Sequence, residues 1–314
     1  MEEVRKHLKS IPAYESHSRR DSSKLYLPSH LTISELYKEY KTNCNRTPVS
    51  RCLYEKEFHK MNLRIKKPHV DTCQLCDKLS LQLKLSGDPL FQTQLSEHHE
   101  EADKAYDAKS LDKTLSKNDP SRKTITFDMQ QCLPTPLLRN SISFYKRQLW
   151  TFNMTVHDCD SGNVFCFLWH ECVAGRGAND VGSCIYHYLV NQLDPKVKHL
   201  TMYSDSCGGQ NRNSYIAVMC MTALQNSPNL ETIDHKFLIP GHTHMESDVD
   251  HSVIEKKKKK YNGEIHHPHD WVQLIRQVGK KDQFTVHEMS SEDVFKLFFI
   301  IKRPSSASQR RLRW

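Results

Sequence analysis

The chain has 314 residues, of which 37% are hydrophobic and 26% charged. This length suits one large domain or two modest ones, and no run of about 18 apolar residues is present to form a membrane-spanning helix. Lys and Arg number 45 against 37 Asp and Glu, a net charge of +8 that favours a polyanionic partner such as DNA over a membrane. The N-terminus contains no apolar core of a signal peptide, so we expect eleven reduced cysteines in the cytosol or nucleus, a few of which bind metal.

The first sixty residues predict an arm followed by two helices. Residues 1–25 are charged and serine-rich without hydrophobic periodicity, so we expect a flexible basic arm. Residues 31–40 (LTISELYKEY) place apolar side chains at helical spacing, with Thr32 or Ser34 as the N-cap. A second short helix is expected within residues 50–63. The pair is compatible with a DNA-binding helix-turn-helix, although two short helices are common in other folds.

A Cys-x-x-Cys pair comes next and favours a zinc site. Cys73 and Cys76 have the spacing with which such sites usually begin. The imidazoles of His98 and His99 are the nearest downstream ligands that could complete the coordination of Zn²⁺. Other candidate ligands are His69, Cys52 and Cys44. A redox role fits less well, because the pair does not lie between a strand and a helix.

The helical composition of residues 77–117 ends at Asn118-Asp119-Pro120, and the pattern then changes. The expected elements are strands at 124–131, 143–158 and 163–174, a helix at 179–193, a strand at 199–205, a helix at 213–227, a strand at 232–241 and a helix at 248–260. The order β-β-β-α-β-α-β-α is that of the ribonuclease-H-like fold. The predicted class is therefore α/β with a ribonuclease-H-like mixed sheet, preceded by a mostly helical, zinc-stapled N-terminal region.

These patterns divide the chain into four parts. The predicted parts are a flexible basic arm (1–25), a helical DNA-binding and zinc region (26–118), a ribonuclease-H-like domain of catalytic type (119–302) and a basic tail (303–314). We expect the tail to be disordered, because it is basic and lacks hydrophobic periodicity.

Two aspartates stand at positions in this order that favour catalysis. Asp128 interrupts the first strand, where an unpaired buried carboxylate would be costly. Asp205 closes the fourth strand, in the segment YSDSCGGQN. The first and fourth strands are neighbours in ribonuclease-H-like sheets, so the two carboxylates are expected at one edge. A simple turn-capping role for Asp205 is the alternative.

A third carboxylate is expected on the helix after the fifth strand. We favour Asp248, which begins that helix, with Asp250 as the alternate. The two lie about 200° apart around a helix, so both cannot face one metal ion. Further acidic candidates are Glu246 and Glu255. Imidazoles that would assist as phosphate donors or proton carriers are His244 and His251.

A cluster of three carboxylates suits the hard cations Mg²⁺ or Mn²⁺. Two such ions roughly 3.5–4 Å apart activate a water or a 3′-hydroxyl and stabilise the leaving oxygen in phosphoryl transfer. The predicted catalytic and magnesium-binding residues are Asp128, Asp205 and Asp248.

Polar and basic residues beside these acids predict contacts with DNA. The amides after Asp205 can donate hydrogen bonds to phosphates or bases. A run of five lysines follows the third acid; a solvated face would explain most such runs, but this position favours phosphate neutralisation and a nuclear localisation signal. The predicted nucleic-acid-binding residues are Gln210, Asn211, Asn213, His244, Lys256, Lys257, Lys258, Lys259 and Lys260.

The segments FDMQQ, YSDSCGGQNRN and GHTHMESDVDHSVIE, with KKPHVDTCQLCD upstream, resemble a transposon-derived family with ribonuclease-H-like (DDE/D-type) transposase domains. The resemblance implies an ancestry in DNA strand transfer, and its motif positions carry over to Asp128, Asp205 and the Asp248/Asp250 pair. The chain departs from the family in its D-x-D pair, where a DDE glutamate would stand. It also begins inside the longer N-terminal region of such proteins, which points to a degenerate, truncated or domesticated copy.

Three functions are compatible with these observations. The first is a nuclear, metal-dependent endonuclease or transposase that cuts DNA and transfers the strand, acting as a homo-oligomer as transposases do. The second is a domesticated DNA-binding protein whose acids are relics. A zinc hydrolase is the weakest, because the Cys/His site would be coordinatively closed.

Overall fold

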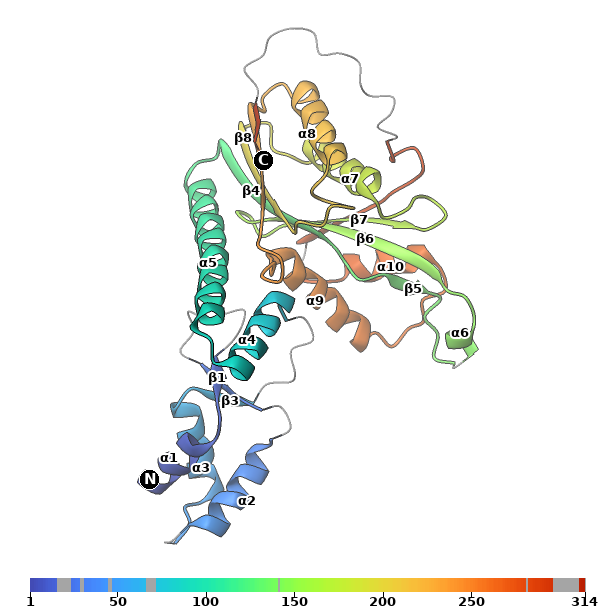
Figure 1. The fold of residues 1–314 in the computed structure, drawn as a ribbon. Coiled ribbons are helices and arrows are strands. Elements are labelled where there is room, and N and C mark those ends of the chain that lie inside the picture. Colours follow the sequence, from blue (N-terminus) through green and yellow to red (C-terminus); the bar gives the residue numbers. More distant parts are fainter. Residues whose placement is uncertain are drawn as a thin grey trace. The chain divides into compact units, whose positions relative to one another are not determined.

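The computed structural model describes residues 1–15, 24–28, 31–44, 47–65, 72–140, 142–280, 282–295 and 311–313. The chain divides into two compact units, Met1–Gln92 and Thr93–Trp314, each drawn in Figure 1. Across the described ranges, no helix combines the length and the apolar character that crossing a membrane requires.

The first unit contains helices and a small sheet of order β1-β2-β3. Its elements are α1 (Glu2–Ser10), β1 (Tyr14–Glu15), β2 (Leu25–Leu27), α2 (Ile33–Asn43), α3 (Arg51–Lys60), β3 (Leu63–Ile65) and α4 (Gln74–Ser86). The two helices expected after the arm are confirmed as α2 and α3. Thr32 caps α2 through a reciprocal box, in which its hydroxyl accepts from the Glu35 N–H (3.2 Å) and its own N–H donates to the Glu35 carboxylate (2.9 Å).

The expectation of a flexible arm is wrong for residues 2–10, which form α1. Val4 and Leu8 lie one turn apart on this helix and are buried in a core shared with Tyr54 and Phe58 of α3. Arg5 also forms an ion pair with Glu57. Two apolar residues in a charged segment therefore suffice to dock the helix, and residues 16–23 of the expected arm lie outside the described part.

The helical segment predicted at 77–117 consists of two helices, α4 and α5 (Pro89–Asn118). Gly87 ends α4 in the left-handed conformation (φ 65°), and its N–H donates to the Leu83 carbonyl at 2.9 Å. Pro89 then starts α5, a position where its missing N–H costs nothing. The predicted boundary at 118/119 is the end of α5, whereas the two compact units divide at 92/93.

The second unit is built on a mixed sheet, which confirms the α/β class. Its strands lie in the order β10-β7-β6-β4-β8-β9-β11, with β5 beside β6. β4 pairs antiparallel with β6 and β6 with β7, while β8 is parallel to β4 and β9 to β8. The strands are β4 (Arg122–Met129), β5 (Leu133–Thr135), β6 (Leu149–Asp158), β7 (Val164–His170), β8 (His199–Ser204), β9 (Thr232–Phe237), β10 (Phe284–Glu288) and β11 (Arg311–Arg313).

Helices cover both faces of this sheet (Figure 1). One face packs on α7 (Ala178–Asn191) and α8 (Ser214–Asn226), and the other on α9 (Glu246–Lys260) and α10 (Pro268–Arg276). The eight elements expected after residue 120 are all present. The short α6 (Ile142–Tyr145), α10, β5, β10 and β11 were not expected, and β11 falls in the predicted tail, whose other residues lie outside the described part.

The central strands are apolar on both faces because both are covered. Phe127 and Met154 pack with Ile185 and Ile216 in one core cluster. On the other face, fully buried Trp271 of α10 donates its indole N–H to the Thr135 hydroxyl at 3.0 Å. The sheet is therefore fixed from both sides, and the ends of its central strands have fixed positions.

Stability should fall on mild acidification because of His235 on β9. This side chain is 0% exposed and packs against Phe127 and Phe237, and burial lowers its pKa from 6.5 to about 3. The unfolded chain takes up a proton near pH 6.5 and the folded chain does not. Stability is then lost as the pH falls from 6.5 toward 3, by up to roughly 1.4 kcal/mol per pH unit. Urea unfolding of the unaltered chain and of His235→Gln between pH 7 and 5 should show the shallower slope in the variant; equal slopes would contradict the assignment.

Candidate active site

Two neighbouring parallel strands bring Asp128 and Asp205 to one edge of the sheet. In the pairing of β4 with β8, Thr126 stands opposite Tyr203. Asp128 and Asp205 each lie two residues beyond this pair: Asp128 is still within β4, opposite Thr155 of β6, and Asp205 follows the last residue of β8. The parallel pairing places the two aspartates at the same end of neighbouring strands, whereas the group of ligand atoms within 4.8 Å of one another contains Asp128 and not Asp205.

Helix α9 adds the third carboxylate. The helix packs against β4 and β6, and Asp248 lies in its first turn with His251 three residues further on. Asp128, Asp248 and His251 each offer one ligand atom, and these atoms lie within 4.8 Å of one another. One strand and one helix turn therefore provide a group that could hold a metal ion.

The carboxylates of this group repel one another, and this repulsion affects their pKa values. Burial, followed by repulsion from Asp248 and Asp205, raises the pKa of Asp128 to about 7. Burial likewise raises the pKa of Asp248, although the Met245 N–H, which donates to its carboxylate at 2.7 Å, opposes the shift. A divalent cation among these oxygens would offset the repulsion, so the charge pattern fits a cation site.

Asp205 is held in place by its own loop. Its carboxylate accepts the Cys207 N–H at 3.1 Å and the side-chain amide of Asn211. Asn211 is only 2% exposed, which does not fit the predicted contact with nucleic acid. Its role in the structure is to orient Asp205.

His251 supplies a neutral imidazole beside the carboxylates. Burial lowers the pKa of this side chain to about 4, so it is uncharged at neutral pH. Its Nε2 atom is buried and has no hydrogen-bond partner among the described residues. A neutral imidazole nitrogen is a suitable metal ligand or proton carrier.

The other acids of α9 are engaged elsewhere. Asp250, the alternate third ligand, is 4% exposed and lies 2.7 Å from Nδ1 of His157 on β6. Glu246 contacts Lys109 (3.1 Å) and Lys113 (2.5 Å), both on α5. Glu255 pairs with Gln130 (3.2 Å) and Lys258 (3.3 Å). Asp248 is the acid of this helix that lies with Asp128.

The other amides predicted to contact DNA form hydrogen bonds within the protein. The Gln210 amide donates to the Arg176 carbonyl (3.1 Å), and the Asn213 side chain caps α8 by accepting from the N–H groups of Tyr215 and Ile216. Both amides thus have local structural roles. Arg176, which sequence reasoning missed, offers a positive charge that lowers the pKa of Asp128; its flanking glycines were the available signal.

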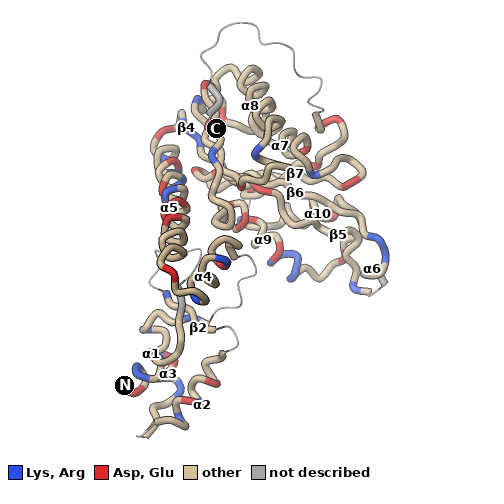
Figure 2. Tube along the Cα trace, viewed as in Figure 1, with Lys and Arg blue, Asp and Glu red and all other residues tan. Residues whose placement is uncertain are grey.

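The lysine run forms the end of α9, as Figure 2 shows by its blue segment. Lys258 lies 5.7 Å from the ring centroid of Trp271 and pairs with Glu255, so its charge is partly used within the fold. Lys256, Lys259 and Lys260 are exposed, whereas Lys257 is half-buried. His244 lies 3.7 Å from the Asp248 carboxylate.

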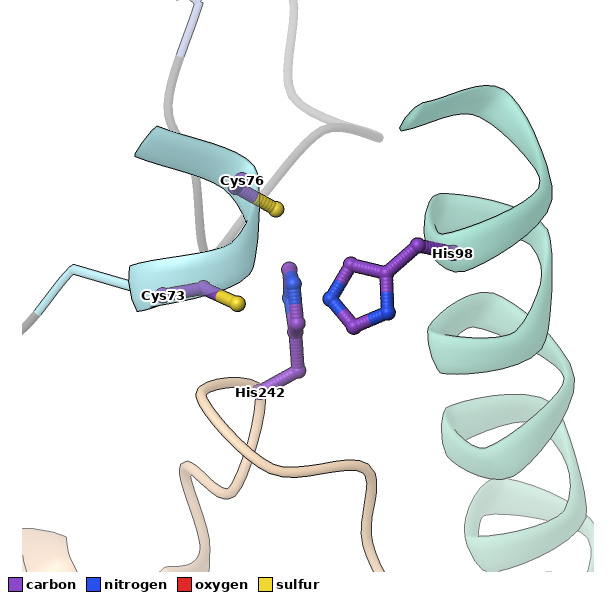
Figure 3. Close-up of side chains that lie close together, drawn as sticks. All are labelled: Cys73, Cys76, His98 and His242. Carbon is purple, nitrogen blue, oxygen red and sulfur yellow. The ribbon is translucent and has the colours of Figure 1, made fainter. Parts of the chain in front are cut away.

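Two further pairs of metal-ligand side chains appear in Figure 3, one in each unit. In the first unit, Cys73 and Cys76 stand at the start of α4 with both side chains buried. In the second unit, the His98 ring of α5 lies 5.0 Å from that of His242, which follows β9. His242 was not among the ligands expected from the sequence. His69 lies outside the described residues.

The comparisons with known proteins assign no activity. Residues 153–299 match a family model described as a domain of unknown function, DUF7869. No curated protein and no solved structure matches the chain. The matched segment contains Asp205 and Asp248 but not Asp128.

Substituting two aspartates of this region should change stability in opposite directions. Asp128→Asn removes a buried charge that its neighbours repel, so at pH 8 and without divalent ions it should stabilise the chain by about 1–2 kcal/mol. The sign follows from the raised pKa of Asp128, since the folded state loses stability as the pH rises from 3.8 through 7. Asp250→Asn breaks the pair with His157 and should destabilise by about 1–3 kcal/mol. Urea unfolding in a chelator tests both, and a destabilising Asp128→Asn would contradict the electrostatics described above.

Proposed function

We propose that this protein carries out metal-dependent cleavage and strand transfer of DNA phosphodiesters at Asp128, Asp205 and Asp248. The observation that carries the proposal is the group formed by Asp128, Asp248 and His251, whose ligand atoms lie within 4.8 Å of one another. Folding brings the carboxylates of Asp128 and Asp248 together despite their repulsion. Such an arrangement is characteristic of a functional site rather than of a stabilising one.

The sheet order supports a ribonuclease-H-like fold within this proposal. Its first three strands, β4, β6 and β7, are consecutive antiparallel neighbours. The fourth and fifth strands, β8 and β9, extend the sheet in parallel from the other side of β4. Acids lie near the ends of the first and fourth of these strands, at Asp128 and Asp205.

The donor set fits Mg²⁺ and fits Mn²⁺ better. Carboxylate oxygens suit both ions, whereas an imidazole such as that of His251 favours the softer Mn²⁺. Asp128, Asp205 and Asp248 would hold the ion, which when bound activates a hydroxyl nucleophile and stabilises the leaving oxygen. The fit rests on three oxygen donors whose mutual repulsion a cation relieves.

The protein's own residues have defined tasks in this reaction. Asn211 fixes the orientation of Asp205, and the Met245 N–H fixes that of Asp248. His251 is uncharged and adds an imidazole nitrogen to the ligand group beside Asp128 and Asp248. Arg176 and the exposed lysines at the end of α9 supply positive charge for the DNA backbone. Nuclear localisation and assembly of several copies on DNA belong to the same proposal.

Asp128→Asn and Asp248→Asn should each reduce Mn²⁺-dependent DNA cleavage by at least roughly 10³-fold, because each removes a charged ligand of the ion. Cleavage of a labelled duplex in Mn²⁺ and in Mg²⁺ measures the effect. Glu255→Gln is the matched control, since it alters an acid of the same helix that does not join the cluster, and it should retain cleavage. Unchanged cleavage in both aspartate variants would refute the assignment.

A non-catalytic DNA-binding protein is the second candidate. It is favoured by the exposed lysines of α9, which need no acid to bind phosphates. Such a protein would show salt-dependent DNA affinity that Asp128→Asn leaves intact or increases, without cleavage by the unaltered chain. The same binding and cleavage assays therefore separate the two functions.

The proposal also includes zinc bound by Cys73 and Cys76 with imidazole ligands, for which the sequence offers His98 and His99. Two thiolates and two imidazoles form a closed tetrahedral set, which is typical of a structural site. Such a site would stabilise the polar helical segment without taking part in the chemistry at Asp128.

Cys73→Ser should bind one equivalent of zinc less than the unaltered chain and should unfold at a lower temperature. Metal analysis of the purified proteins, with thermal unfolding before and after chelation, provides the measurement. Cys52→Ser, which alters an exposed cysteine of α3, is the control and should retain the metal. Equal zinc content in Cys73→Ser and the unaltered chain would argue against thiolate coordination.

A further inference from the structure

A second group of potential metal ligands lies at the β10 edge of the large sheet, within the second unit. It consists of His187 on α7, His287 on β10 and Asp293 in the turn after β10. Their ligand atoms lie within 4.8 Å of one another. None of these residues belongs to the acidic cluster or to the Cys/His set.

The fold explains why these side chains meet. Side chains alternate between the two faces of a strand. Phe284 and Val286 of β10 therefore pack in the core beneath α10, while Met289 joins the core beneath α7. His287 has the same parity as Met289 and consequently faces α7, where His187 is located.

The two imidazoles are close and are backed by an apolar wall. Their ring centroids are 4.1 Å apart with an interplanar angle of 36°. Phe167 of β7 contacts both rings edge-on, with centroid distances of 5.5 and 5.9 Å. Nδ1 of His187 and Nε2 of His287 are buried and have no hydrogen-bond partner among the described residues. Buried polar atoms in this state are costly, and a bound ion would satisfy both.

The carboxylate of Asp293 is held in position by hydrogen bonds within its own turn. Oδ2 of Asp293 accepts the N–H and the hydroxyl of Ser290 at 2.7 and 2.8 Å. The same oxygen lies 3.7 Å from Nε2 of His287, which is beyond hydrogen-bond distance. A carboxylate has about four acceptor positions, so those not used by Ser290 remain available to an ion.

We propose that His187, His287 and Asp293 bind a Zn²⁺ ion that fastens β10 and the turn after it to α7. Two imidazoles and one carboxylate suit zinc and related transition ions rather than Mg²⁺, which prefers oxygen ligands. Zn–N bonds of roughly 2.0–2.1 Å require donor atoms roughly 3.3 Å apart, which small rotations of the side chains achieve. Three protein ligands leave a fourth position for water. The site is independent of the proposed catalysis.

The test is zinc binding by the metal-free chain, measured by equilibrium dialysis and by thermal unfolding. His187→Gln and His287→Gln should each bind one equivalent of zinc less than the unaltered chain, and Asp293→Asn should weaken that equivalent at least roughly tenfold. His266→Gln alters an exposed histidine and should bind as the unaltered chain does. Mg²⁺ should neither occupy the site nor raise the unfolding temperature through it.

A second measurement needs no variant and so does not depend on the folding of one. Diethyl pyrocarbonate modifies accessible histidines, and peptide mass spectrometry locates the modified positions. Zn²⁺ should slow the modification of His187 and His287 in the unaltered chain while leaving that of His266 unchanged. Equal zinc stoichiometry in all variants, or modification of both histidines that zinc does not slow, would overturn the proposal.

Discussion

The repulsion between the partly buried carboxylates of Asp128 and Asp248 is a cost that the second unit has to offset. Neither aspartate can move away, because one belongs to a central strand and the other to the first turn of a helix packed on that strand. The two-sided core of the sheet must therefore supply the free energy that holds them together. A cation placed between the two carboxylates would relieve this repulsion.

The contrast with the neighbouring acids makes the point sharper. Asp250, Glu246 and Glu255 share a helix with Asp248, and each has a positive or donating partner from another element. An acid of this helix can therefore be buried or partly buried and still have its negative charge compensated by a partner. Asp248, which lies with Asp128, is bonded instead to the Met245 N–H at the start of its own helix.

The sequence predicted the part of the fold that follows from hydrophobic periodicity. Both faces of the sheet are covered, so β6, β7 and β8 appear as strong apolar runs, and the glycine and proline signals between them marked the turns. α1 was missed because its docking depends on only two apolar residues, Val4 and Leu8. β10 was missed because a short edge strand paired over a hundred residues away leaves little local signal.

The candidate site, like the fold, could be predicted from the sequence only in part. The strand order predicted that Asp128 and Asp205 meet, since parallel neighbours end at the same edge. The choice between Asp248 and Asp250 depended on which side of α9 faces the sheet edge, and His157 on β6 decides it by taking Asp250. The grouping of His187 with His287 could not be foreseen, because it requires knowledge of how β10 pairs with β7.

Helix α9 is clamped on two flanks before any ligand arrives. On one flank Asp250 joins it to β6, and on the other Glu246 joins it to the lysines of α5. These two contacts tie the first turn of α9 to β6 and to α5. Asp248 stands between these two contacts in the sequence, so the turn that carries it is fixed by the fold itself.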